Sequence, residues 1–149
     1  MMKTNKLFLL AFAAMVMQST VSFADDNDRI IPAEQLPTSA QTFVKETFPN
    51  NTIMYVEKDG YVNPTYEVHL SNGTRVEFDR KGIWNKVDTQ LEPVPALLIP
   101  TAIDNYVKTN FANTHITKID KEPYGYEIEL SNNLDLKFNK AGALIGMDD

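Results

Sequence analysis

The chain has no cysteine among its 149 residues. Disulfides, thiolate nucleophiles, cysteine-rich zinc sites and cysteine-linked lipid anchors are therefore excluded. Basic residues are also few, because 14 Lys and Arg stand against 20 Asp and Glu, for a net charge of −6. This balance argues against a nucleic acid or an anionic membrane surface as the partner.

Histidine is scarce as well, since His69 and His115 are the only two in the sequence. Neither is accompanied by a Gly-x-Ser-x-Gly elbow, and the sequence has no His-Glu-x-x-His motif, phosphate loop or dinucleotide fingerprint. Pairs of carboxylates on hairpin strands could face each other, but no pattern encloses them in a pocket. We therefore predict a non-enzymatic protein with no catalytic residues.

Long apolar runs are absent except at the start of the chain. Lys3 and Lys6 precede the apolar run 7–17, which is too short for a transmembrane helix of about 20 residues. Small residues then lead up to Ala24. This order predicts a signal peptide over 1–24, cleaved after Ala24, followed by a flexible acidic N-terminus over 25–29. We expect a periplasmic protein without membrane insertion, because a small exported domain without disulfides suits the periplasm.

The remaining sequence contains an internal repeat. Residues 31–37 (IPAEQLP) align with 94–100 (VPALLIP), and residues 66–72 (YEVHLSN) align with 126–132 (YEIELSN). Each copy begins with a proline at a helix start and continues with apolar residues at helical spacing and then with short alternating segments. The predicted fold is α+β, with one helix and four antiparallel strands in each of two repeats, 30–90 and 91–149.

The hairpin register follows from the alternation. In the first copy the apolar residues fall at even positions, namely Tyr66, Val68, Leu70, Val76 and Phe78. Residues that pair across an antiparallel ladder share a face, so the loop must have three residues, 71–73. Such a loop needs a residue with positive φ at its end, which predicts that role for Gly73 and, in the second copy, Asn133.

One helix per copy can cover only one face of the sheet, which leaves the other face, here called the open face, to water. The register predicts on it Glu67, His69, Arg75, Glu77, Glu127, Glu129, Asp135 and Lys137. A four-residue loop at 79–82 would add Trp84 and Lys86, and Tyr55, Tyr61 and Tyr124 would lie at the margins. Aromatic residues among charges favour protein recognition. A merely solvated face, with Trp84 packed against a neighbouring strand, is the alternative.

The stretches 66–73 (YEVHLSNG) and 76–84 (VEFDRKGIW), together with the repeat and the signal, resemble the PepSY-like periplasmic proteins of Bacteroides-type bacteria. That family is similar in fold to the β-lactamase inhibitory protein, and the resemblance covers residues 30–149. It implies one curved antiparallel sheet of about eight strands with helices on one face. It also implies that the concave face binds, or inhibits, another protein. Some members have been described as calcium-regulated.

Two functional hypotheses follow. The first is a periplasmic module that binds, and in one version inhibits, another periplasmic or cell-envelope protein through the open face. The second is a periplasmic sensor of a small ligand or calcium. No cofactor is expected, because neither the acidic stretch 25–28 nor the loop 79–82 fits the twelve-residue calcium loop.

Overall fold

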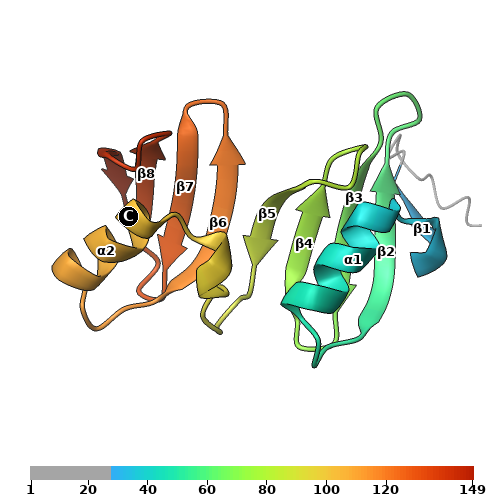
Figure 1. Ribbon diagram of the computed structural model, residues 1–149, viewed down its shortest axis with the longest axis horizontal. Coiled ribbons are helices and arrows are strands. Elements are labelled where there is room, and N and C mark those ends of the chain that lie inside the picture. Colours follow the sequence, from blue (N-terminus) through green and yellow to red (C-terminus); the bar gives the residue numbers. More distant parts are fainter. Residues whose placement is uncertain (1–27) are drawn as a thin grey trace, which may run out of the picture.

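The computed structural model describes residues 28–149 (Figure 1). The predicted signal peptide, 1–24, lies outside the described residues. So do residues 25–27 of the predicted acidic N-terminus, 25–29. None of the helices within 28–149 has the length and apolar character needed to cross a membrane.

Two α-helices and nine strands make up the described chain, with a short 3-10 helix before each α-helix. In chain order they are β1 (Arg29–Ile31), η1 (Ala33–Gln35), α1 (Thr38–Thr47), β2 (Ile53–Asp59), β3 (Thr65–Leu70), β4 (Arg75–Phe78), β5 (Trp84–Asp88), η2 (Ala96–Leu98), α2 (Thr101–Asn110), β6 (Ile116–Glu122), β7 (Gly125–Leu130), β8 (Asp135–Asn139) and β9 (Leu144–Asp148).

The strands form a single antiparallel sheet in which each strand pairs with its neighbours in sequence, from β1 to β9. The α+β class is therefore confirmed, with nine strands where about eight were predicted. The extra strand is β1, whose Arg29 and Ile31 pair with Lys58 and Val56 of β2. Three residues directly before Pro32 are too few to show the alternation that indicates a strand.

Helix starts follow the proline rule. Pro37 and Pro100 immediately precede α1 and α2, where the missing N–H of proline costs no hydrogen bond. At the other ends, the backbone N–H groups of Phe48 and Phe111 donate to the carbonyls of Val44 and Val107. Each helix is ten residues long. Figure 1 shows each of them over its own half of the sheet.

The two halves are joined through the backbone. Lys86, Val87 and Asp88 of β5 pair with Asp120, Ile119 and Lys118 of β6. The pairing extends past β5, because the N–H of Thr89 donates to the carbonyl of Thr117 at 2.9 Å and its buried hydroxyl donates to the same oxygen at 2.8 Å. The sheet is consequently continuous from β1 to β9.

Both α-helices lie on the same side of this sheet (Figure 1). The core fills the space between them and the sheet, and alternate strand residues are buried in it, among them Val68, Val76, Phe78, Val87, Ile119, Ile128, Leu136 and Phe138. The prediction of helices on one face only is confirmed. The open face has no helix over it within 28–149.

The hairpin register is also confirmed. Tyr66 pairs with Phe78, and the N–H of Leu70 donates to the carbonyl of Thr74, which closes a three-residue loop. Gly73 ends that loop with a φ of 86°, and Asn133 ends the corresponding loop with a φ of 65°. The two loops meet one backbone requirement with the two residue types that best tolerate positive φ.

The placement of Trp84 on the open face was wrong. A bulge between Glu77 and Phe78 shifts the register of β4 and β5, so that Trp84 pairs with Phe78 while Lys86 pairs with Glu77. The indole therefore points to the helix side and stacks on Phe43 of α1, with ring centroids 6.1 Å apart. The alternation rule fails here because a bulge adds one residue to a strand and reverses its faces.

Trp84 also contacts the second half of the sheet. The Nζ atom of Lys121 lies 3.7 Å from the centre of the indole ring and donates to the carbonyl of Trp84 at 3.1 Å. Burial beside the ring lowers the pKa of Lys121. Trp84 is thus a structural residue that packs α1 and β6 together.

We predict that Trp84→Ala destabilises the fold rather than a binding surface. Truncation of core Trp or Phe costs about 3–5 kcal/mol, and because Trp84 is only partly buried we expect a loss of about 2–3 kcal/mol in the free energy of unfolding. Urea denaturation followed by circular dichroism measures it. Leu97→Ala is the control, since Leu97 is 75% exposed and should change stability by less than about 0.5 kcal/mol. Equal effects of the two substitutions would contradict this role.

Candidate functional site

The open face is covered by charged side chains from all strands between β2 and β8. The ladders pair Glu57 with Glu67, Glu77 with Lys86, Lys86 with Asp120, and Glu127 with Lys137 across neighbouring strands. Each of these residues has at least one buried apolar residue directly beside it in the chain. Carboxylates outnumber cationic groups on this face, which makes it acidic as well as polar.

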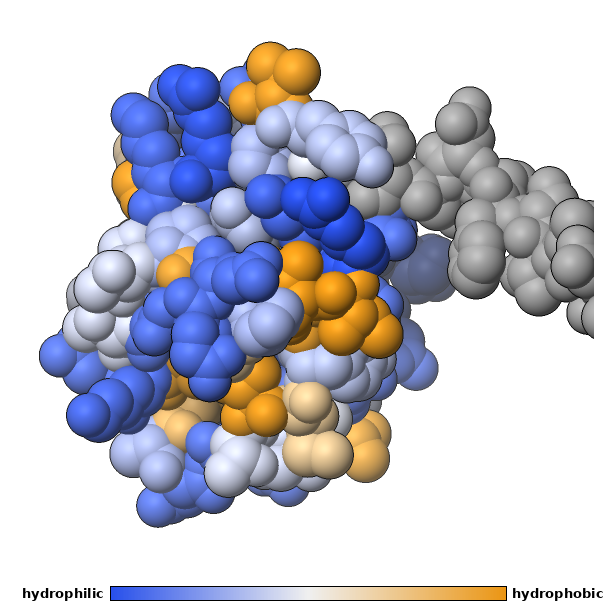
Figure 2. Space-filling view, turned by 90° about the vertical axis from the view of Figure 1, so that its right-hand side faces the viewer, coloured by the Kyte–Doolittle hydropathy of each residue, from blue (hydrophilic) through white to orange (hydrophobic). Residues whose placement is uncertain are grey.

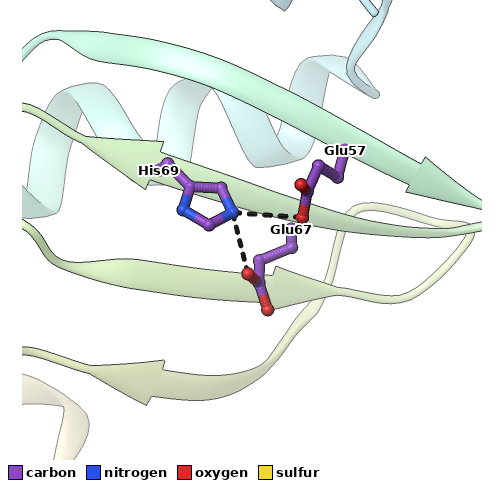
Figure 3. Close-up of side chains that lie close together, drawn as sticks. All are labelled: Glu57, Glu67 and His69. Carbon is purple, nitrogen blue, oxygen red and sulfur yellow. Dashed lines mark hydrogen bonds and ion pairs between the residues drawn. The ribbon is translucent and has the colours of Figure 1, made fainter. Parts of the chain in front are cut away.

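His69 lies at the centre of the most compact group. Its Nε2 atom is 2.8 Å from Oε1 of Glu67 and 3.2 Å from Oε2 of Glu57. Figure 3 shows both carboxylates turned toward this one nitrogen, Glu57 from β2 and Glu67 from β3. The ring is fixed on its flat side by Tyr55, which stacks on it with centroids 4.1 Å apart and an angle of 15° between the planes.

Burial raises the pKa of Glu67, and the nearby carboxylates of Glu77 and Glu57 act in the same direction. His69 and Arg75 oppose this shift through their attraction for the carboxylate. The Glu57, Glu67 and His69 side chains are the one group of three or more metal-ligand types that residues 28–149 bring together, with their ligand atoms all within 4.8 Å.

Arg75 and Lys86 are held by other acids. An Nη2 atom of Arg75 donates to Oδ2 of Asp88 at 2.7 Å, and this bond raises the pKa of the guanidinium. Nζ of Lys86 lies 3.6 Å from Oε1 of Glu77. Pairing across neighbouring strands therefore neutralises part of the open face internally.

The second half has a lysine at the place corresponding to Tyr55. Lys118 pairs with Glu129 in the ladder as Tyr55 pairs with His69, and Nζ of Lys118 lies 3.8 Å from Glu129 and 4.0 Å from Asp120. Burial raises the pKa of Asp120 in spite of the attraction of Lys86 and Lys118. Desolvation of this carboxyl thus outweighs its ion pairs.

A shallow hollow of about 250 Å³ lies beside the His69 group. Carboxylates dominate its lining, which is made up of Asp28, Glu57, Asp59, Thr65, Tyr66, Glu67 and Glu77. At the same end of the sheet, hydrophobic residues gather among hydrophilic ones (Figure 2). A second depression there, lined by residues of β1 and β2, includes the exposed Ile30 and Met54 and also Tyr55.

The structure places nine of the predicted side chains on the open face by their ladder pairs. These are Glu67, His69, Arg75, Glu77, Lys86, Glu127, Glu129, Asp135 and Lys137. Tyr55 lies on the face itself rather than at its margin. Tyr61 is exposed in the β2–β3 connection with Arg29 over its ring, and the hydroxyl of Tyr124 donates to Glu127 at 3.0 Å.

Four further charged residues of the open face were not predicted from the sequence, namely Glu57, Asp88, Lys118 and Asp120. All four lie on strands whose faces were not assigned or whose partner strand was unknown. The signal was present for two of them, because the repeat aligns Lys118 with Tyr55 and Asp120 with Glu57. Both β2 and β6 have a register shift directly after their first residue, and the sequence does not reveal this shift. With the shift known, the alternation would have predicted Glu57, Lys118 and Asp120 on the open face.

We predict that Asp120→Asn stabilises the protein at neutral pH. A carboxyl whose folded-state pKa is raised holds its proton to higher pH in the folded chain, so its ionisation costs stability as pH rises above the unfolded value of about 3.9. The variant should have a higher urea midpoint at pH 7, and the difference should close near pH 4. Asp104→Asn, which removes an exposed helix ion pair to Lys108, is the control and should lower the midpoint slightly. A lower midpoint for Asp120→Asn at pH 7 would mean that its ion pairs dominate.

Solved structures share this fold. A periplasmic protein from Bacteroides vulgatus, described as putative, is 36% identical with a TM-score of 0.78, over 84% of this chain and 99% of that one. A second B. vulgatus protein, described as a putative periplasmic protein of unknown function, is 29% identical with a TM-score of 0.78, over 82% and 99% of the two chains. A Bacteroides thetaiotaomicron protein, described as a putative calcium-regulated periplasmic protein, is 37% identical with a TM-score of 0.77, over 82% and 97%.

Comparison with curated proteins gave no match. The sequence pattern of one family, described as "Putative beta-lactamase-inhibitor-like, PepSY-like", matches residues 24–63 and 64–146. These two segments include nearly all of the nine-stranded sheet and both helices. The predicted resemblance is therefore confirmed, and the chain belongs to the PepSY-like family.

Proposed function

We propose that the chain is a non-enzymatic periplasmic protein that binds another periplasmic or cell-envelope protein through the open face. The observation that carries this proposal is the asymmetry of the sheet. Both helices and the whole core lie on one side, while the other side is a broad charged surface with no helix over it in the described chain. Rigid sheet surfaces that combine charges with aromatic residues suit protein recognition.

The charge of the face indicates the chemistry of the partner. Carboxylates outnumber cations on it, so a partner with a basic surface would gain both specificity and a faster rate of encounter. Several of the side chains are already ordered by ion pairs, including Arg75 with Asp88 at 2.7 Å and Lys137 with Asp148 at 2.9 Å. Less side-chain entropy is therefore lost when a partner docks.

An exposed apolar edge adjoins the charged surface. Ile30 and Met54 are 71% and 64% exposed, next to the Tyr55 ring that stacks on His69. Interfaces commonly combine such apolar anchors with a polar surround. The periplasmic location is supported by the descriptions of the related structures, and inhibition of the partner is the narrower form of the proposal that the family description suggests.

We predict that reversing charges on the open face weakens partner capture. The test variant is Glu77→Lys with Glu127→Lys, and the partner is captured in intact cells by a photo-crosslinking residue at position 129. Binding should fall by about tenfold or more, because complementary charges become like charges.

The matched control is Glu34→Lys with Glu46→Lys, two exposed residues on the helix side that change the net charge equally. The control variant should capture the partner as the wild type does. A higher salt concentration should weaken capture by the wild type and by the control variant alike. Equal capture by the two double variants would show that the open face does not bind the partner. The same conclusion would follow if the otherwise wild-type chain gave crosslinks from a photo-crosslinking residue at position 46 and none from position 129.

A second candidate function is a calcium response. The favouring observation is the hollow lined by Glu57, Asp59, Glu67 and Glu77, because calcium takes its ligands from clustered oxygen atoms. A relative that is 37% identical is described as calcium-regulated. In this version, calcium bound in the hollow would change the charge that the open face presents.

We predict that millimolar calcium raises the melting temperature of the chain, whereas magnesium at the same concentration raises it less. At a concentration 100 times the Kd, a ligand stabilises the folded state by about 2.7 kcal/mol, which amounts to several degrees in a domain of this size. Asp59→Asn with Glu77→Gln should remove the calcium effect. An unchanged melting temperature of the wild type in calcium would dismiss this candidate.

A further inference from the structure

We propose that Glu57, Glu67 and His69 form a binding site for a divalent transition metal of the zinc type on the open face. Two carboxylates and one imidazole are a ligand set that such ions accept, with a fourth position left for water or another ligand. The inference is independent of partner docking and rests on the geometry of these three side chains.

The ligand atoms are already close to the spacing that zinc requires. In a tetrahedral site with bonds of about 2.0 Å, ligand atoms lie about 3.3 Å from one another. Here Nε2 of His69 is 2.8 Å from Glu67 and 3.2 Å from Glu57, and all three ligand atoms lie within 4.8 Å. Small side-chain shifts would therefore admit an ion between the imidazole nitrogen and the two carboxylates that face it in Figure 3.

The site is held by rigid elements. Glu57 and Glu67 are directly opposite each other in the β2–β3 ladder, and His69 follows two residues later on the same face. The stacked ring of Tyr55, 4.1 Å away, restricts rotation of the imidazole. The three side chains are only partly buried, at 40%, 27% and 17% exposure for Glu57, Glu67 and His69, so an ion can enter from solvent. Ligands fixed in this way lose little entropy on binding.

The second half of the sheet gives an independent indication that a cation belongs here. In that half, the pair formed by Lys118 and Glu129 corresponds to the pair formed by Tyr55 and His69 in the first half. Likewise, the pair Asp120 and Glu127 corresponds to Glu57 and Glu67. In both halves these pairs follow the same irregularity at the start of the strand. There the ammonium of Lys118 lies within 4.0 Å of two carboxylates. The first half has an aromatic ring in place of that lysine and an imidazole in place of Glu129.

The histidine distinguishes this site from a calcium site. Calcium takes six to eight oxygen ligands, whereas imidazole nitrogen is a good ligand for zinc, cobalt, nickel and copper. The surrounding carboxylates of the hollow, such as Asp59 and Glu77, add negative potential that attracts any divalent cation but do not supply nitrogen. The nitrogen of His69 is therefore the group that selects the class of metal.

The test is titration of the purified, tag-free chain with zinc by calorimetry, and with cobalt by absorption spectroscopy. We expect one zinc per chain and cobalt bands typical of four-coordinate nitrogen and oxygen ligands. His69→Ala should weaken zinc binding by tenfold or more, and Glu57→Gln and Glu67→Gln should each weaken it. His115→Ala is the matched control and should bind as the wild type does, because the ring of His115 contacts the carbonyl of Leu91 instead.

A second test variant is Tyr55→Lys, which places in the first half a lysine that corresponds to Lys118 of the second half. Its ammonium should occupy the place of the metal and abolish zinc binding, while circular dichroism and the melting temperature show that the fold is retained. Absence of zinc binding by the folded wild type, or equal binding by His69→Ala and His115→Ala, would overturn the proposal. Calcium should still raise the melting temperature of His69→Ala if the hollow binds it, so the two cation proposals fail separately.

Discussion

The backbone pairing of β5 with β6 is the interaction on which the rest of the molecule depends. Three residue pairs and the buried hydroxyl of Thr89 connect two half-sheets into one sheet of nine strands. Each half has a single α-helix, so the helices can cover only one side of the joined sheet. Within residues 28–149 no helix lies over the other side, and an antiparallel sheet can leave such a face to water, which fits its charged residues and their pairing across the strands.

Strand irregularities decide which side chains reach that surface. In β2 the shift between Ile53 and Tyr55 leaves Ile53 against the core while Tyr55 points to the open face. The shift between β4 and β5 has the opposite consequence for Trp84, which it turns inward onto Phe43. A bulge reverses the faces of a strand without changing its length much, so it redistributes aromatic residues between core and surface at little cost to the ladder.

These shifts also mark the limit of what the sequence predicts. The strands β3, β4, β7 and β8 alternate strictly, and their faces, pairing and three-residue loops follow from the positions of the apolar residues. The faces of β2, β5 and β6 do not follow, since alternation cannot locate a bulge, and β1 is too short to alternate at all. For this reason the sequence did not predict the group formed by Glu57, Glu67 and His69. His69 and Glu67 were predicted on the open face, but the face of Glu57 depends on the register shift after Ile53 in β2.

The two halves share one ladder geometry but balance its charge differently. In the second half Lys118 neutralises Asp120 and Glu129 from within the chain, although burial still raises the pKa of Asp120. In the first half Glu57 and Glu67 both lie within 3.2 Å of the His69 imidazole, and Tyr55 takes the place that Lys118 has in the second half. Because desolvated carboxylates gain most from an added cation, the first half is where an external positive charge has most to stabilise. A metal ion or a basic side chain of a partner would meet the same need at the same place, and we therefore expect recognition by the open face to be centred on β2 and β3.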